Sequence, residues 1–127
     1  MTFIKFDKRG AKIYKNEPSI TITRMGIFSI GKLAYEKYFT DRKYVILYYD
    51  PESKIIGLQP TNESTPEAHT IRVFPSGKAI SFSAKPFLDF FGIEYASGSR
   101  TYVVNWNEKD GMVEIDLKMF KETRGHN

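Results

Sequence analysis

The sequence has no cysteine, which rules out a disulfide framework, a thiolate nucleophile and a cysteine zinc site. A chain of this kind suits a reducing compartment. The sequence also lacks any apolar run near the roughly 18–20 residues that a membrane-spanning helix needs. Its first residues, MTFIKFD, mix charged with apolar side chains and lack the apolar stretch of a signal peptide. We therefore expect a soluble, cytoplasmic protein with no membrane partner.

Residues that could carry out catalysis are equally sparse. The two histidines, His69 and His126, lie beside a predicted linker and next to the last residue, without the spacing of metal ligands. Asp50 and Asp110 each share a predicted turn with a glutamate, and turn formation alone accounts for them. Residues 76–78, Ser-Gly-Lys, are too short and wrongly placed for a phosphate-binding loop. These observations predict a protein that is not an enzyme and has no metal or cofactor.

Charge is present, and it is unevenly distributed. The 127 residues carry a net charge of +4. Residues 1–43 hold ten Lys/Arg and four Asp/Glu, whereas residues 44–127 hold nine and eleven. A basic first third favours a polyanion as partner, through phosphate contacts that release counterions. The simpler alternative is that the lysines only keep a small protein soluble.

The hydrophobic pattern predicts a strand-rich domain. Hydrophobic residues make up 41% of the chain, enough for one core in a single domain of this length. Alternating and β-branched segments predict strands at residues 19–23, 27–30, 44–49, 54–59, 69–74, 79–82, 102–107 and 112–118.

Two short helices are predicted between these strands. The first begins near residue 31, where apolar residues start to recur at helical spacing. The second has Ser83 as its N-cap, Pro86 in its first turn and Gly92 just after its last residue. The spacing predicts that both helices contribute to one core through Leu33, Tyr38, Phe87 and Phe91.

The order strand, turn, strand, helix, strand, turn, strand occurs twice, in residues 19–59 and 69–118. Side by side, Ile30 is matched with Phe82 and Tyr44 with Tyr102. Residues 60–68 (PTNESTPEA) have the composition of a linker, residues 1–17 indicate an extra N-terminal hairpin, and residues 119–127 form a polar tail. The expected fold class is α+β, mostly β, with two repeats packed as one pseudo-twofold domain.

The first repeat carries a family resemblance in residues 26–32. It resembles the swapped-hairpin module of the AbrB/SpoVT and MraZ transcription factors, whose pattern is Gly-Arg, apolar-x-Ile, Pro-Lys, a short helix and a hairpin. Ile27 and Gly31 stand where that family usually has arginine and proline. The resemblance implies DNA binding, with both copies of the module supplied by one chain. The positions that fit are Gly26, Phe28, Ile30 and Lys32.

The leading hypothesis is a small DNA-binding protein that acts as a transcriptional regulator. Its phosphate contacts are expected in the turn before each helix, on the outer face of the helix and just beyond it. One alternative is a protein–protein interaction or assembly module, such as a homodimer or an accessory protein of a phage or mobile element. The basic residues at the expected positions are Arg24, Lys32, Lys37, Arg42, Lys43, Lys78 and Lys85.

Aromatic side chains on the strands support a third hypothesis, binding of single-stranded nucleic acid. Aromatic rings that face water beside lysines can stack bases, although filling the core is their ordinary role. Alternation along a strand predicts that one of Tyr48 and Tyr49 is buried and the other exposed. The strand aromatics are Tyr44, Tyr48, Tyr49, Tyr102 and Trp106.

Overall fold

The fold is given by a computed structural model that describes residues 17–74 and 79–122. Nearly all of the expected N-terminal hairpin, the turn at 75–77 and Lys78 lie outside these residues. The elements in chain order are β1 (Ser19–Ile22), β2 (Ile27–Ile30), α1 (Lys32–Ala34), the π-helix η2 (Tyr35–Phe39), β3 (Tyr44–Asp50), β4 (Ile55–Thr61), β5 (Ala68–Thr70), β6 (Arg72–Val73), β7 (Ile80–Ser83), α2 (Lys85–Phe90), β8 (Arg100–Asn107), β9 (Met112–Asp116) and β10 (Lys121–Glu122).

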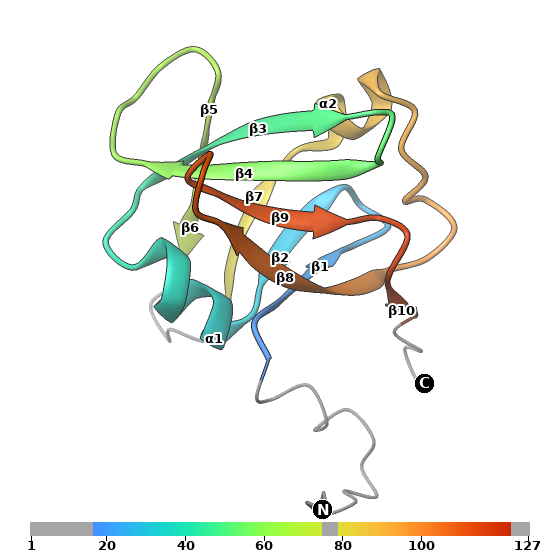
Figure 1. Ribbon diagram of the computed structural model, residues 1–127, viewed down its shortest axis with the longest axis horizontal. Helices are drawn as coiled ribbons and strands as arrows, with labels where there is room; N and C mark the ends of the chain where they lie inside the picture. The colour runs from blue at the N-terminus through green and yellow to red at the C-terminus, as the bar shows by residue number, and fades with distance from the viewer. Residues whose placement is uncertain (1–16, 75–78, 123–127) are drawn as a thin grey trace, which may run out of the picture.

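The strands form a nearly closed, barrel-like antiparallel sheet, so the fold is α+β and mostly β, as predicted (Figure 1). The strand order is β5-β3-β4-β9-β8-β1-β2-β7-β6, and β10 pairs with β8. The two ends of this order are consecutive in the chain, since β5 pairs with β3 and β6 pairs with β7. Only Ile71 separates them. The single strand predicted at residues 69–74 is therefore two short strands that pair with different neighbours.

The two halves of the chain do not form separate bodies. The β1–β2 and β3–β4 hairpins of the first half are separated in the sheet by β8 and β9 of the second. Each hairpin is therefore bordered by strands from the other half. One core lies inside the barrel, and both halves contribute to it.

The boundaries of the expected linker and tail differ from the observed elements. Pro60 and Thr61 are the last residues of β4, and Ala68 is the first residue of β5. The connection is therefore confined to residues 62–67. Within the expected tail, β10 adds a short strand beside Arg100 and Thr101 of β8.

The core side of each helix differs from the prediction. The buried helical residues are Ala34, Phe39 and Leu88. Ala34 and Phe39 are five residues apart, which is the repeat of a π-helix rather than the α-helical spacing assumed from the sequence. Of the four residues expected in the core, Tyr38 and Phe87 only pack against its edge, Leu33 is half-buried, and Phe91 is exposed.

The C-terminal end of α2 matches the prediction, and its N-terminal end does not. Ser83 is the last residue of β7, and Ala84 takes the N-cap position without a side-chain cap. The Ala84 N–H donates to the Gly26 carbonyl, which extends the β2–β7 ladder by one bond. At the other end, Gly92 has φ +65° and Ile93 N–H donates to the Leu88 carbonyl, so the glycine ends the helix as predicted.

Candidate nucleic-acid interface

The structure divides the predicted basic residues between two ends of the molecule. Figure 1 places α1 at the lower left and α2 at the upper right. Lys32 and Lys37 belong to the first helical segment, and Arg42 and Lys43 follow it; all four side chains are exposed. Arg24 and Lys85 lie together at the α2 end. Lys78 is outside the described residues.

Backbone contacts anchor the first helical segment to the barrel. The Gly31 N–H donates to the Ser19 carbonyl at 2.9 Å, and a Cβ on Gly31 would lie 2.8 Å from that oxygen. At the other end of the segment, the Thr40 hydroxyl donates to the Tyr35 and Glu36 carbonyls. Asp41 then turns the chain with φ +61°. Residues 32–43 therefore follow a defined path over one end of the barrel.

Sheet pairing brings one further basic residue to this end. The Lys43 N–H donates to Asn62 Oδ1, and the Lys43 carbonyl accepts from Ile71 N–H at 2.9 Å. Arg72, the next residue, is exposed on β6. Sequence reasoning missed Arg72 because only the contact between the ends of β3 and β5 places it near Lys43. We define the cationic end as Lys32, Lys37, Arg42, Lys43 and Arg72. None of these five forms an ion pair with another described residue.

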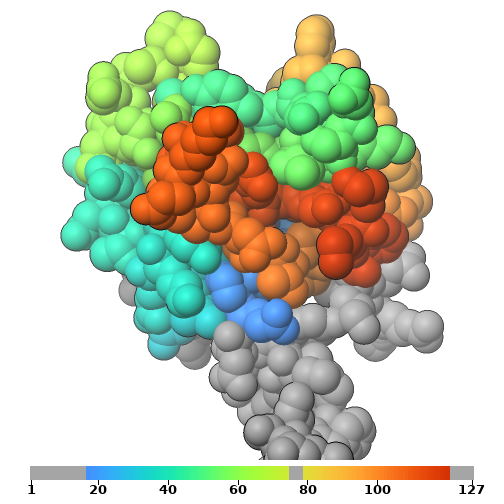
Figure 2. All heavy atoms as spheres, in the orientation of Figure 1, coloured from blue at the N-terminus to red at the C-terminus, as the bar shows by residue number. Residues whose placement is uncertain are grey.

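A hollow of about 220 Å³ lies beside the cationic end, and its walls are Lys37, Tyr38 and Trp106. The Tyr38 and Trp106 rings are nearly parallel, with centroids 5.7 Å apart and planes at 9°. Trp106 Nε1 donates to Glu108 Oε2 at 3.1 Å, and the indole stays 41% exposed. In Figure 2 the cyan surface of residues 32–43 meets the orange surface of the β8–β9 hairpin.

The α2 end neutralises its lysine. Lys85 Nζ lies 3.1 Å from Asp89 Oδ2, and the Tyr95 hydroxyl donates to Asp89 Oδ1 at 2.7 Å. The Tyr95 hydrogen bond and Lys85 hold the pKa of Asp89 below its usual range, and Asp89 raises the pKa of Lys85. The turn between β1 and β2 also packs closely against α2. A Cβ on Gly26, in this turn, would lie 2.8 Å from Lys85 Cβ. Lys85 is thus already paired, unlike the five lysines and arginines of the cationic end.

The strand aromatics separate into buried and exposed groups. Tyr102 is buried in the core and Tyr44 is half-buried. Tyr48 is exposed and its hydroxyl donates to Gln59 Oε1, whereas Tyr49 packs against the core. The predicted alternation of Tyr48 and Tyr49 is confirmed. Trp106 combines exposure with a cationic neighbour.

Neither a cluster of metal ligands nor a membrane-spanning helix is found within residues 17–74 and 79–122. No group of three or more His, Asp or Glu side chains is placed to hold a metal ion. His69 is half-buried on β5, with Nδ1 3.1 Å from the Ser83 carbonyl, and His126 lies outside the described residues. In the same part of the chain, no helix has both the length and the apolar character needed to cross a membrane.

Comparison with protein-family models, with curated proteins and with solved structures finds no match. The resemblance of residues 26–32 to the swapped-hairpin regulators stays a prediction, and the geometry described above is the basis for assigning a function.

Proposed function

We propose that the protein binds nucleic acid, with DNA as the leading candidate, and that the cationic end supplies its phosphate contacts. The observation that carries the proposal is the set of five exposed lysines and arginines on and beside the first helical segment, none of which forms an ion pair with another described residue. Free cations gain most from phosphate contact, because each one neutralised releases condensed counterions from the nucleic acid. Binding of this kind needs no catalytic group, in keeping with the expectation of a non-enzyme that regulates transcription.

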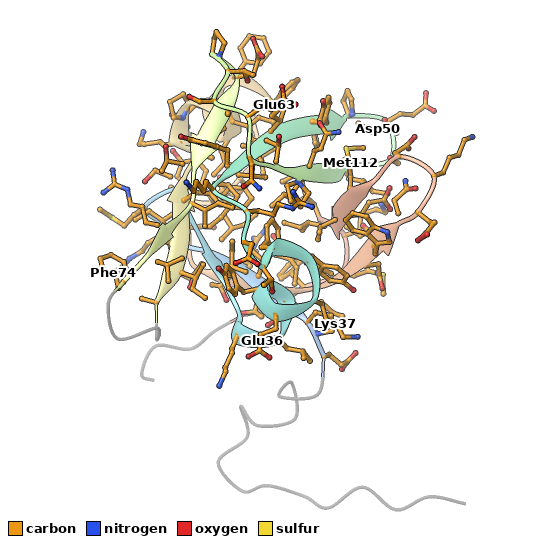
Figure 3. All side chains as sticks on the ribbon, turned by 90° about the vertical axis from the view of Figure 1, so that its left-hand side faces the viewer. Glu36, Lys37, Asp50, Glu63, Phe74 and Met112 are labelled. Atoms are coloured by element: carbon orange, nitrogen blue, oxygen red, sulfur yellow. The ribbon has the colours of Figure 1, made fainter. Side chains whose placement is uncertain are left out.

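Charge elsewhere in the chain supports this choice of surface. Figure 3 shows the acidic Glu36 beside Lys37 at the lower end of the molecule, with Asp50 and Glu63 at the upper end. The positive charge of the lower end is therefore an excess over acidic residues that are also there. The first sixteen residues carry one Asp against five lysines and arginines. The described chain begins next to the cationic end, since the Ser19 carbonyl contacts Gly31. A segment rich in lysine and arginine therefore precedes the described residues in the sequence at the end where Lys32 lies. The five N-terminal cations are Lys5, Lys8, Arg9, Lys12 and Lys15.

We further propose that the barrel arose from two copies of one unit. The pairing pattern supports this interpretation. Exchanging β1 with β5–β6, β2 with β7, β3 with β8 and β4 with β9 leaves the list of paired strands around the barrel unchanged. Such a pattern follows from a twofold arrangement of two equivalent units.

Individual residues support the same correspondence. Lys54 and Gly111 are 57 positions apart, and both have positive φ. Each donates its backbone N–H to the carbonyl of the residue four positions earlier: Lys54 to Asp50 at 2.7 Å, and Gly111 to Asn107 at 2.8 Å. Phe28 pairs with Phe82 across β2 and β7, and their rings stack with centroids 4.7 Å apart. When β2 is exchanged with β7, we therefore match Phe28 with Phe82, whereas the comparison of the two sequence repeats matches Ile30 with Phe82.

A second candidate function is association with a protein, and the α2 end favours it. Phe90 is 81% exposed and Phe91 39% exposed, and their rings are 4.9 Å apart. Adjacent exposed aromatic rings are enriched at protein interfaces. In this case binding would be apolar and would change little with salt, whereas phosphate-driven binding would weaken steeply.

The test compares two variants that each remove two positive charges, one from each end. Arg42→Gln with Lys43→Gln removes charge from the cationic end, and Arg24→Gln with Lys85→Gln is the matched control. Binding to a labelled 20-base-pair DNA is measured over a series of salt concentrations. We expect the first variant to lower the slope of log K against log salt by about 1.8, because duplex DNA gives about 0.9 for each phosphate contact. The control should retain the wild-type slope.

Equal losses in both variants would contradict the assignment to the cationic end. A wild-type protein that does not bind DNA even at low salt would overturn the proposed function and favour a protein partner at the α2 end. Phe90→Ser then tests that candidate, since Phe90 is 81% exposed and the variant should greatly weaken association without changing the fold of the barrel.

A further inference from the structure

We infer that the hollow of Lys37, Tyr38 and Trp106 is a stacking site for an unpaired base, so that single-stranded nucleic acid is the preferred ligand of the cationic end. This inference rests on the proposed function and specifies its substrate class.

The position of Trp106 on its strand makes its exposure unusual. Tyr102 and Val104 point into the barrel and are buried, and Trp106 is the next residue on that side of β8. The strand carries the indole beyond the core to the mouth of the barrel, where η2 covers it only in part. A large apolar ring on the core side of a strand is thereby left accessible from solvent.

The rings are held in an orientation that suits stacking. Tyr38 packs against the core and lies nearly parallel to Trp106, and Glu108 fixes the indole through its N–H. Stacking on pre-positioned rings loses little side-chain freedom when a ligand binds. Every base has a flat aromatic face, so such a site binds bases with little dependence on sequence.

The neighbouring charges suit the phosphates of the same strand. Lys37 forms part of the wall of the hollow and is exposed. Arg42, Lys43 and Arg72 add positive charge farther along the same side, and the exposed carboxylates of Glu36 and Asp41 precede Lys37 and Arg42 in the chain. A base in the hollow would leave its flanking phosphates near these cations. A base within a duplex cannot reach the hollow without unpairing, which costs a few kcal/mol.

The α2 end provides an internal comparison. There Tyr49 occupies the corresponding place near the end of β3, but Phe87 and Phe91 pack against it at centroid distances of 6.4 and 5.0 Å. Two rings of the protein therefore pack against Tyr49, whereas Trp106 has Tyr38 stacked on it and a hollow beside it.

Trp106 is the single tryptophan of the chain, so tryptophan fluorescence, excited at a wavelength that the eight tyrosines do not absorb, reports on this site alone. The experiment titrates the full-length protein with three ligands of equal length: a dT 20-mer, an abasic 20-mer with the same phosphates, and a 20-base-pair duplex. We expect the dT 20-mer to quench the fluorescence and to bind more tightly than the other two. Tyr38→Leu should weaken dT binding by roughly 5- to 150-fold, the range for loss of one stacked base, with abasic binding unchanged.

Tyr48→Leu is the matched control, because Tyr48 is an exposed strand tyrosine that does not line the hollow; it should bind all three ligands like the wild type. Trp106→Phe should retain part of the preference for bases, which separates stacking from a general loss of structure. Equal binding of the dT and abasic 20-mers with unchanged fluorescence would overturn the stacking site and leave the proposed function standing. No binding of any of the three at low salt would overturn both.

Discussion

The two ends of the barrel are each covered by a short helical segment, and they differ in the type of helix and in the side chains that it carries. At each end a short helical segment covers the end of a long strand, η2 over β8 and α2 over β3. Trp106 and Tyr38 leave a hollow beside Lys37, whereas Tyr49 is surrounded by Phe87 and Phe91. The difference indicates that a few side chains decide whether a barrel mouth is open to a ligand or filled.

Charge separates the two ends in the same way. The five basic residues of the cationic end form no ion pair with another described residue, while Lys85 at the α2 end is bound to Asp89. Asp50 and Glu52 in the β3–β4 turn are exposed as well. Asp50 accepts the backbone N–H groups of Glu52 and Ser53, and its hydrogen bonds with Ser53 hold its pKa below the usual range. The cationic end keeps an excess of positive charge although Glu36 and Asp41 are exposed there too, whereas the β3–β4 turn carries Lys54 beside Asp50 and Glu52. A polyanion would therefore be attracted more strongly to the cationic end.

The largest expected effect tests whether the two helical segments are anchored equally. Phe39 and Leu88 are fully buried, one at each end. Phe39→Ala should lower the free energy of unfolding by about 3–5 kcal/mol and Leu88→Ala by about 2–5 kcal/mol. Urea denaturation followed by circular dichroism measures both. Phe90→Ala, at an exposed position on α2, should change stability by less than about 0.5 kcal/mol. A large effect of Phe90→Ala would show that the α2 surface is covered in solution.

The next effect concerns the close approach of the β1–β2 turn to α2. Gly26 has φ +79°, and a Cβ there would meet Lys85 at 2.8 Å. Gly26→Ala should therefore lower the free energy of unfolding by about 1–3 kcal/mol. Gly92→Ala, with positive φ but no neighbour within 4 Å, should cost about 1 kcal/mol. Thermal denaturation of both, with Gly98→Ala as the unstrained control, should give this order.

A smaller effect distinguishes the two hairpin turns. Lys54 and Gly111 occupy corresponding left-handed positions, and only the glycine adopts this conformation without steric cost. Gly111→Ala should lower stability by about 1 kcal/mol, whereas Lys54→Gly should be neutral or slightly stabilising. Urea midpoints of the two single variants measure the difference. A marked loss of stability in Lys54→Gly would argue that the lysine side chain has a structural role that the β8–β9 turn lacks.

The smallest expected effect is the pH dependence of the α2 end. The pKa of Asp89 is lower in the folded protein than its usual value, so its contribution to stability is present above that value and is lost as pH falls through the folded pKa. Wild type should have a higher urea midpoint than Asp89→Asn at pH 7, and the two should converge as pH falls through the lowered pKa of Asp89 in the folded protein. A difference that persists in acid would assign the effect to packing rather than to charge.

Much of the fold followed from local pattern. Residues 27–30 and 44–49 alternate or are β-branched, and they form β2 and β3 close to the predicted bounds. Gly92 ended α2 as predicted because only a residue free to adopt positive φ fits after the last turn. The exposure of Tyr48 and burial of Tyr49 followed from strand alternation alone. Each of these features depends on neighbours within a few positions.

Other features depended on contacts between distant segments. Ser83 was expected to cap α2, but the β2–β7 ladder retains it as a strand residue. Phe39 entered the core instead of Tyr38 because a π-helical segment changed the residues that face inward. The basic residues were visible in the sequence, but nothing local indicated that Arg24 and Lys85 would separate from Lys37.

The sequence by itself determined the class of fold, most of its strands, the absence of cysteine chemistry and the excess of positive charge in the first third. These properties are set by composition and by short-range periodicity. The tertiary structure alone decided that β5 and β6 nearly close a barrel, that Arg72 joins Lys43, and that Trp106 meets Tyr38 beside Lys37. Strand pairing brings together residues that are tens of positions apart, and no local pattern specifies which ones will meet.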